Sequence, residues 1–277
     1  MSAPGVSSIS RTWALLAKDF AELRQSPAIF IPPVLTGAAT VFYPFVIAVI
    51  VPYMTGERLS ESSDFEIAVE MYRTQPASRA LGPEGAIQAM IFQFALTLMV
   101  GLTTVTGGMS IAAHSIVGEK QARSLEPLLA TPLRTSELLI AKILGAAIPG
   151  TMLTLAYFGI YVGAVALFAE PGVWTILLTP RSLALVLVLG PLAALVGLQI
   201  AVCTSSRAHD VRSAQQLGAL VIAVPMVALQ ISQVIGGVVL DGSILALIAL
   251  VLAGLNLALF LFAIVIFDRE SILTRWK

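Results

Sequence analysis

Charged residues and cysteine are both scarce in this chain. Only 12% of its 277 residues are Asp, Glu, Lys or Arg, about half of the roughly 25% typical of soluble domains. The 16 basic and 16 acidic residues balance, so net charge does not argue for a nucleic-acid partner, and we expect none. Cys203 is the single cysteine, which excludes an intrachain disulfide and argues against a cysteine-based metal site.

The sequence patterns of several catalytic sites are also missing. The chain contains no GxxxxGK[ST] phosphate loop, so we do not expect it to bind ATP in that manner. HExxH, CxxC and GxSxG are absent as well. The two histidines, His114 and His209, have no partner histidine or cysteine nearby, and we favour a structural role for each. We therefore expect neither an enzyme nor a protein that binds a cofactor or metal.

Apolar residues, in contrast, dominate the sequence. They make up 57% of it, and the mean hydropathy is +0.92, which indicates an integral membrane protein. A helix needs about 20 residues to cross ~30 Å of hydrocarbon, and continuous rather than alternating runs select helices over barrel strands. Six runs without any charged residue or histidine are long enough: Ala28–Tyr53, Ala86–Ala113, Ile143–Phe168, Leu183–Cys203, Leu217–Leu240 and Ile244–Phe267.

The predicted fold is therefore an all-α membrane protein, with one transmembrane domain over residues 1–277. Prolines are expected to kink or start the spans: Pro32, Pro33, Pro44, Pro149, Pro191 and Pro225.

The distribution of Lys and Arg predicts the orientation. With the N-terminus in the cytoplasm, only four of the 16 basic residues fall outside, namely Arg58, Arg73, Arg79 and Arg181. Positive charge favours the cytoplasmic side of short loops. We therefore expect a multi-pass protein of the cell membrane, with both termini in the cytoplasm and residues Met54–Gly85 as an extracellular loop.

An amphipathic helix is predicted before the first span, over Ser7–Ser26. Trp13, Leu16, Phe20 and Leu23 recur at helical spacing, and charged residues that include Lys18, Asp19 and Glu22 supply the polar side. Because the first apolar run follows directly, we favour a helix lying in the membrane interface over one packed on a soluble partner.

The stretch Gly118–Lys142 is unusually rich in charge for this chain and lies between two apolar runs. Ser124–Ala130 is predicted to form a short helix with Leu125, Leu128 and Leu129 on one face. Thr131-Pro132 ends it. Ser136 is then expected to cap the next helix, with Glu137 in its first turn. A plain connecting loop would not need the leucine face.

The polar residues within the spans are neutral. For any single one, hydrogen bonding between helices is the favoured role, and Gln88 and Ser110 belong to the same set. Together they would suit a path for amphipathic cargo better than one for bare ions, because ion carriers generally place ionisable groups at membrane depth. The candidate path residues are Gln93, Thr97, Thr103, Thr104, Gln199, Gln230, Gln233 and Asn256. The adjacent Gly107 and Gly108 predict close approach of a neighbouring helix.

The charged stretch resembles the membrane subunits of type-2 ABC transporters. Glu119-Lys120, then Ser124-Leu125-Glu126-Pro127-Leu128-Leu129-Ala130-Thr131-Pro132, and finally Glu137 and Lys142 follow that family's pattern. Arg123 and Ala141 replace two glycines of the pattern. The N-terminal helix, the segment Ser205–Gln216, the basic tail Asp268–Lys277 and the number of spans agree with the same family.

The resemblance implies a half-transporter that exports a substrate. Two permeases, identical or related, would pair with two separate ATPase subunits that hold ATP and Mg²⁺. The segment Gly118–Ser136 would be the cytoplasmic coupling segment, contacting the ATPase through Glu119, Lys120, Arg123, Ser124, Leu125, Glu126, Leu128 and Leu129. The alternative is a membrane anchor or assembly protein that recruits a cytoplasmic partner without transport. A membrane enzyme is the least favoured hypothesis, because the spans carry no acid, base or metal ligand.

Overall fold

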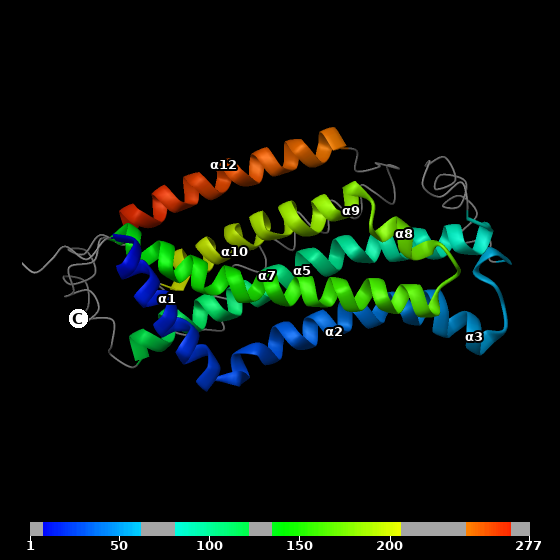
Figure 1. Cartoon of the computed structure of the whole chain (residues 1–277), viewed down its shortest axis with the longest axis horizontal. Helices are drawn as coiled ribbons and strands as arrows, with labels where there is room; N and C mark the ends of the chain where they lie inside the picture. Colours follow the sequence, from blue (N-terminus) through cyan, green and yellow to red (C-terminus); the bar gives the residue numbers. More distant parts are fainter. Residues whose placement is uncertain (1–7, 62–80, 122–134, 206–241, 267–277) are drawn as a thin grey trace, which may run out of the picture.

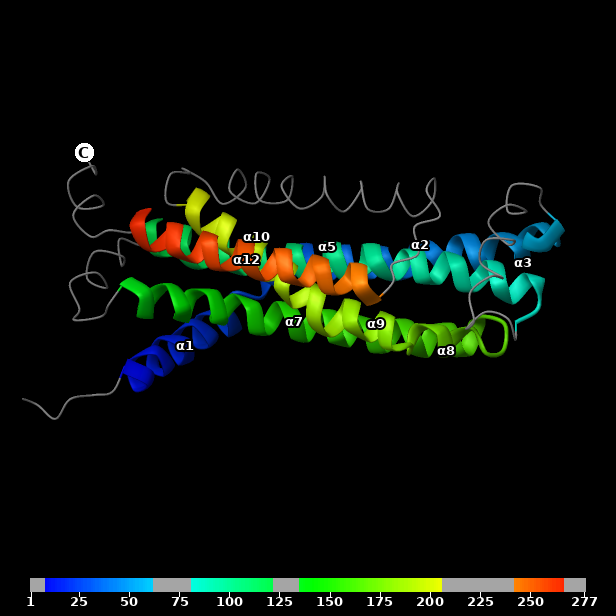
Figure 2. The same ribbon diagram turned by 90° about the horizontal axis from the view of Figure 1, so that it is seen from above.

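The computed structural model describes residues 8–61, 81–121, 135–205 and 242–266. Every regular element in these ranges is a helix, and none is a strand. The long helices run roughly along one axis and form an elongated bundle (Figures 1 and 2).

The N-terminal part is a series of helical pieces: α1 (Ser8–Gln25), the 3₁₀ turn η1 (Pro27–Phe30), α2 (Ile31–Phe45), the π-helical η2 (Val46–Ile50), α3 (Val51–Thr55) and η3 (Leu59–Glu61). Longer helices follow: α5 (Pro83–Gln121), α7 (Thr135–Phe168), the short α8 (Val173–Leu177) and α9 (Pro180–Ala184), the π-helical η6 (Leu185–Leu189), α10 (Gly190–Ser205) and α12 (Gly242–Ile266).

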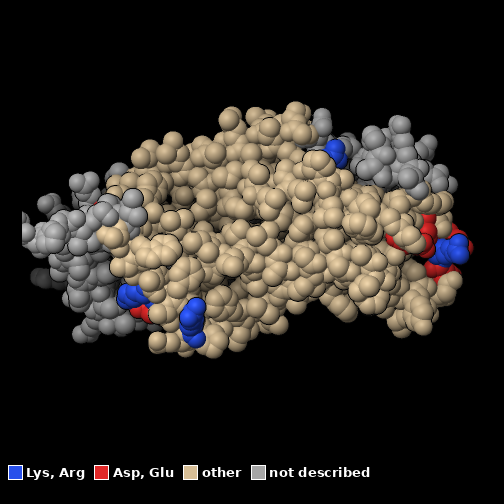
Figure 3. Space-filling view, viewed as in Figure 1, with Lys and Arg blue, Asp and Glu red and all other residues tan. Residues whose placement is uncertain are grey.

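Five of the six predicted spans lie among the described residues. The helices long and apolar enough to cross a membrane are Pro27–Thr55, Pro83–Gly108, Ser136–Phe168, Pro180–Ile200 and Gly242–Ile264. The predicted span Leu217–Leu240 lies outside the described residues. Acidic and basic side chains of the described part gather toward the two ends of the visible face, leaving its broad middle without them (Figure 3). This distribution fits a multi-pass membrane protein.

Helix α5 is the centre of the bundle. It packs against α2, α7 and α10, whereas α12 lies at the edge against α10. In the most apolar window of each span, 67% of the α5 residues are buried but only 6% of the α12 residues. The outward side of α12 is therefore an apolar surface that faces lipid or another protein, and α5 is the helix around which the others are arranged.

Glycine permits the closest approach between α5 and α7. A Cβ atom built on Gly150 would lie 3.0 Å from the backbone nitrogen of Gly108, tighter than ordinary van der Waals contact. The prediction that Gly107 and Gly108 admit a neighbouring helix is confirmed. A second close approach was not predicted: Gly37 of α2 lies under the ring of Tyr157, where a Cβ would come within 2.3 Å of that ring.

Prolines interrupt or start the spans as predicted. Pro32 lies in the first turn of α2, Pro44 lies inside α2 just before the π turn η2, and Pro149 lies inside α7. Pro191 is the second residue of α10, directly after the π turn η6. A proline removes a backbone donor and crowds the preceding turn. The π turns η2 and η6 lie beside Pro44 and Pro191, whereas α7 continues through Pro149 as an α-helix. Pro225 lies outside the described residues.

The helices around the charged stretch are longer than the apolar runs. α5 continues to Gln121, past the end of its apolar run at Ala113, and α7 begins at Thr135, ahead of the apolar run that starts at Ile143. Ser136 therefore lies within the helix instead of capping it, while Glu137 is in the first turn as predicted. At 1.5 Å per residue α5 is ~58 Å and α7 ~51 Å long, beyond the ~30 Å of hydrocarbon. An apolar run measures the membrane-embedded part of a helix, not its full length.

Candidate functional site

The connection between α5 and α7 is the first candidate site, and both of its ends are described. Glu119 and Lys120 lie in the last turn of α5, and α7 begins after the connection. These two helix ends lie with α1 at one end of the bundle, here called the α1 end (Figure 1). The other predicted coupling residues, Arg123, Ser124, Leu125, Glu126, Leu128 and Leu129, lie outside the described residues, so their contact with an ATPase stays a prediction.

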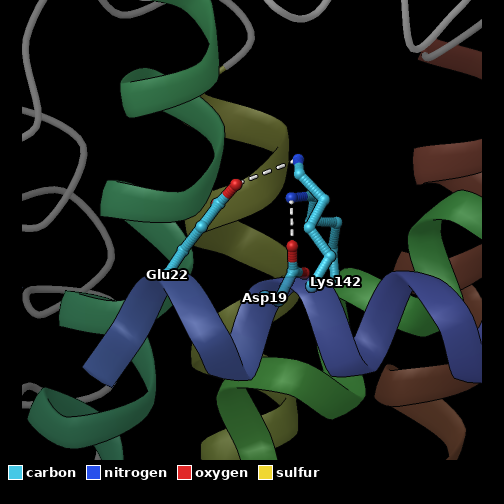
Figure 4. Close-up of polar contacts among 4 residues, drawn as sticks. Asp19, Glu22 and Lys142 are labelled. Atoms are coloured by element: carbon cyan, nitrogen blue, oxygen red, sulfur yellow. Dashed lines mark hydrogen bonds and ion pairs between the residues drawn. The ribbon is translucent and has the colours of Figure 1, made fainter. Parts of the chain in front are cut away.

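A buried ion pair joins α1 to α7 close to this connection. The ammonium nitrogen of Lys142 lies 3.0 Å from Oδ1 of Asp19, and Figure 4 shows the two side chains meeting between the helices. Their side chains are only 6% and 7% exposed. Removing two charges from water is unfavourable unless they remain paired. The pair therefore ties α1 to the beginning of α7.

Apolar residues surround the pair on both helices. Leu15 and Leu16 of α1 pack against Leu138 and Ala141 of α7 in a small buried cluster. The predicted helix over Ser7–Ser26 is present as α1, and Leu16 and Leu23 of its predicted apolar face are buried. Trp13, assigned to the apolar face, is 72% exposed.

Asp19 also departs from the prediction, since it was assigned to the polar side of α1 and is instead buried against α7. The physical reason is Lys142, a partner 123 residues away in sequence, which no local periodicity reveals. The location of α1 in a membrane interface stays a prediction.

A second ion pair lies on the exposed side of α1. Lys18 and Glu22 are 3.2 Å apart and one helical turn from each other, with side chains 42% and 54% exposed. Exposed pairs of this kind contribute about 0.3–0.5 kcal/mol, while removing one partner of a buried pair destabilises a protein by about 3–5 kcal/mol. Removing one partner of the Asp19–Lys142 pair is therefore expected to be more damaging than removing one partner of the Lys18–Glu22 pair.

The second candidate site is the set of neutral polar residues predicted to line a path. Thr103 of α5 lies 3.5 Å from the hydroxyl of Thr40 in α2. Thr154 of α7 donates to the hydroxyl of Thr104 in α5 at 3.2 Å, and Thr104 donates to the Val100 carbonyl. These threonines are hydrogen-bonded between neighbouring helices within one chain.

Two other predicted path residues lie on α5 itself. The hydroxyl of Thr97 lies 3.5 Å from the carbonyl oxygen of Gln93, one turn earlier. Thr97 is buried and Gln93 is half-buried. Gln230 and Gln233 lie outside the described residues.

Gln199 and Asn256 form a polar contact between α10 and α12. Nε2 of Gln199 donates to Oδ1 of Asn256 at 3.0 Å, and the Asn256 amide donates to the carbonyls of Leu192 and Leu252. Oε1 of Gln199 is buried and accepts no hydrogen bond from the described part of the chain. The structure thus brings Thr103, Thr104, Gln199 and Asn256 into contacts between helices, whereas Gln93 and Thr97 contact each other within α5. The role of all six in lining a path stays a prediction.

Two polar residues of α5 donate hydrogen bonds to backbone carbonyls for which a proline occupies the usual donor position of a helix. In a regular helix the Ile29 carbonyl would accept from residue 32 or 33, both of which are prolines without an N–H. Ser110 donates to it instead, at 3.0 Å. Ser110 belonged to the predicted polar set and Pro32 and Pro33 to the predicted proline set, but the bond from Ser110 to Ile29, 81 positions away, was not predicted.

A side chain also replaces a missing backbone donor in η2, which follows α2. The Ala48 carbonyl would accept from residue 52, which is Pro52, and Nε2 of Gln88 donates to it at 3.3 Å. Oε1 of Gln88 also accepts from the Glu170 amide at 2.8 Å. Gln88 therefore joins three segments at the end opposite α1, here called the α8 end. The signal missed in the sequence is a proline four residues after the carbonyl, where an α-helix would place the N–H donor.

An aromatic cluster fills the bundle near the α8 end. The rings of Phe45, Phe92 and Tyr161 have centroids 4.9–6.0 Å apart, within the usual range of aromatic pairs. The Tyr161 hydroxyl donates to the Phe92 carbonyl at 2.8 Å. The carboxylate of Glu84 accepts from the backbone amides of Leu59 and Ser60, which anchors η3 to the first turn of α5.

Among the described residues, no group of three or more His, Cys, Asp or Glu side chains is placed to hold a metal ion. In comparison with protein families, the model described as "ABC-2 family transporter protein" matches residues 13–264. A search of curated proteins finds no match. The family match covers all five described spans and the charged connection between α5 and α7.

Proposed function

The chain belongs to the ABC-2 family of transporter proteins, and from this membership we propose that it is the permease subunit of an ATP-driven exporter. Two copies, or one copy and a related permease, would form the path across the cell membrane. Two separate cytoplasmic ATPase subunits would bind ATP and Mg²⁺ and drive the cycle. Both termini and the α1 end would then lie in the cytoplasm.

The observation that carries the proposal is the family match over residues 13–264. The arrangement of α5 and α7 supports the coupling part of it. Both helices are longer than the hydrocarbon is thick, and their ends at the α1 end bracket residues 122–134. A short connection between two overlong helices is a suitable contact for an ATPase, because a push on it acts on both helices at once.

The neutral polar residues support an amphipathic or hydrophobic cargo. The six apolar runs contain no Asp, Glu, Lys, Arg or His, the residues that usually carry a proton or bind a bare ion at membrane depth. In the proposed cycle, helices separate and expose hydroxyl and amide groups that are paired in the described state, such as Thr104–Thr154 and Gln199–Asn256. Neutral hydrogen-bonding groups on an apolar wall fit a cargo with both polar and apolar parts.

The test is to purify the full-length protein from its native membrane and identify what accompanies it. An exporter brings down an ATPase that contains a phosphate loop, and amphipathic dyes change the ATP turnover of the complex. A membrane anchor would bring down a partner whose ATP turnover, if any, is unaffected by such dyes. Absence of any phosphate-loop ATPase contradicts the proposal.

Variants of the connection locate the coupling. We expect Leu128→Asp and Glu126→Arg each to abolish dye-dependent ATP turnover, because one removes the apolar face and the other reverses a contact charge. Insertion into the membrane should be unchanged. The control is Glu57→Arg, which makes the same charge reversal at an exposed residue of the α8 end. Wild-type turnover in both connection variants would show that the ATPase docks elsewhere.

A further inference from the structure

We propose that Oε1 of Gln199 is the acceptor for a neutral hydrogen-bond donor of the cargo, a hydroxyl or an amide N–H. This inference rests on the proposed function and names the chemical class of its cargo. Gln199 is only 4% exposed, and its Oε1 has no hydrogen-bond partner among the described residues. Buried polar atoms in proteins are nearly always paired, because leaving one unpaired is unfavourable. Oε1 is therefore an acceptor that lacks a donor.

The orientation of the Gln199 amide is fixed by Asn256. The Nδ2 group of Asn256 donates to the carbonyls of Leu192 and Leu252, which uses both of its hydrogens and leaves Oδ1 to face Gln199. Only the nitrogen of the Gln199 amide can donate to that oxygen, and it does so at 3.0 Å. The amide cannot turn over without losing this bond, so the unpaired atom stays an oxygen. The site offers an acceptor rather than a donor.

The absence of charge decides which donors fit this acceptor. None of the six apolar runs contains Asp or Glu, so an ammonium group would be buried there without a counter-ion, which is strongly unfavourable. An ether, ester or ketone oxygen has no hydrogen to donate. A hydroxyl or an amide N–H can donate without bringing a charge. The site therefore favours a cargo whose polar part carries a neutral donor.

The position of Gln199 along the span suits an amphipathic molecule. Gln199 is one residue from the end of the span Pro180–Ile200, and α10 runs toward the α1 end (Figure 1), which the proposed function places in the cytoplasm. On the α8 side, Leu185, Leu189 and Leu245 form a buried apolar cluster between η6 and α12. A molecule of the cytoplasmic leaflet has its polar group near the surface and its tail toward the bilayer centre, so its two parts would meet these helices in the same order.

Access to Oε1 requires the path to open, because the atom is enclosed in the described state. Helix α12 packs mainly on α10, and the cluster of Leu185, Leu189 and Leu245 joins it to η6, which leads directly into α10. We expect α10 and α12 to stay together while other helices move away from them. Such an opening exposes Oε1 to cargo and keeps Asn256 in place to orient it.

The experiment uses the full-length protein, with the proteins that accompany it, in lipid nanodiscs. Radiolabelled dodecanol, dodecyl methyl ether and dodecylammonium are the probes, because they share one tail and differ in the polar group. Binding above that of empty nanodiscs is measured without nucleotide and after trapping with ATP and vanadate, and the state that binds more tightly is used. In the wild type we expect dodecanol to bind about tenfold more tightly than either other probe.

Two variants separate the acceptor from the group that orients it. Gln199→Met keeps the side-chain length but removes the acceptor, so it should abolish the preference for dodecanol. Asn256→Leu frees the Gln199 amide to turn its N–H toward the probe, so the methyl ether should then bind as tightly as dodecanol. The carbonyls of Leu192 and Leu252 keep their regular helical donors in this variant. Gln25→Met is the matched control at an exposed site of α1 and should keep the wild-type preference.

Equal binding of dodecanol and its methyl ether to the wild type overturns the inference, because Oε1 would then meet water only. A preference that survives Gln199→Met overturns it as well, since the acceptor must lie elsewhere. If Gln199→Met does not assemble, Asn256→Leu decides alone, because an unchanged preference there contradicts the fixed amide orientation. Absence of a phosphate-loop ATPase contradicts the proposed function instead. Probe binding is measured without relying on ATP turnover, so the two failures are distinct.

Discussion

The two ends of the bundle are held together by different chemistry. At the α1 end, one buried ion pair and a small leucine cluster join α1 to α7. At the α8 end, a larger apolar cluster with three aromatic rings and the neutral bonds of Gln88 join α2, α5 and the segment after α7. The first contact depends on one pair of opposite charges, whereas the second spreads its stabilisation over many van der Waals contacts.

The two kinds of contact respond differently to displacement. Many small apolar contacts are lost gradually and resist all displacements. A buried ion pair has a narrow optimum, because each ion is unfavourable without the other. It therefore favours one register of α1 against α7 at the end where the connection lies.

Among the variants that test this difference between the two ends, Phe92→Ala at the α8 end is expected to lower the free energy of unfolding most. Phe92 is fully buried between Phe45 and Tyr161, so the change creates a cavity and removes two aromatic contacts. We expect the free energy of unfolding, measured by reversible denaturation in mixed detergent micelles, to fall by about 3–5 kcal/mol. Phe42→Ala, at an exposed site of α2, is the control. A loss below ~1 kcal/mol would mean that the cluster does not hold this end together.

The α1 end should respond differently to single and double changes. Lys142→Met alone should lower the free energy of unfolding by about 3–5 kcal/mol because it removes the ammonium partner of the buried Asp19 carboxylate. Adding Asp19→Asn should recover most of that loss, since neither charge of this pair then remains. A double-mutant cycle checks this by comparing the loss in the double variant with the sum of the losses in the two single variants. Equality of the two would show that the side chains do not interact.

The smallest of the three effects is expected from Gln88→Leu. The change leaves the Ala48 carbonyl and the Glu170 amide without their partner, and an unsatisfied buried group destabilises by about 1–3 kcal/mol. Hydrogen exchange of the Glu170 amide should accelerate at the same time. Gln25→Leu, at an exposed site of α1, should change neither. Unaltered exchange in Gln88→Leu would show that this bond does not hold the α8 end.

Much of the architecture could be predicted from the sequence. Uncharged apolar runs located five spans that the structure describes, and Gly107 and Gly108 correctly predicted a close helix contact. The resemblance carried by Gly118–Lys142 agrees with the family that the chain belongs to. These predictions succeeded because burial in lipid and steric contact depend on residue type within one short segment.

The candidate site was less predictable. Asp19 was assigned to a solvated face because α1 was considered alone, and only the packing of α7 turns that face inward. Helix α5 extends past its apolar run because a helix continues beyond the hydrocarbon wherever its backbone bonds remain satisfied. The start of α7 lies within two residues of the position predicted from the Ser136 cap. The pairing of Ser110 and Gln88 with carbonyls freed by proline required knowing which helix lies beside α2.

By itself, the sequence determined that this is a helical membrane protein with uncharged spans and a charged connection, because hydropathy acts residue by residue. Only the tertiary structure decided which polar groups meet. Lys142 finds Asp19, Gln88 finds Ala48 and Gln199 finds Asn256 across 40 to 123 positions of chain. Such pairings are set by the order in which helices pack around α5, and that order is a property of the whole chain rather than of any one segment.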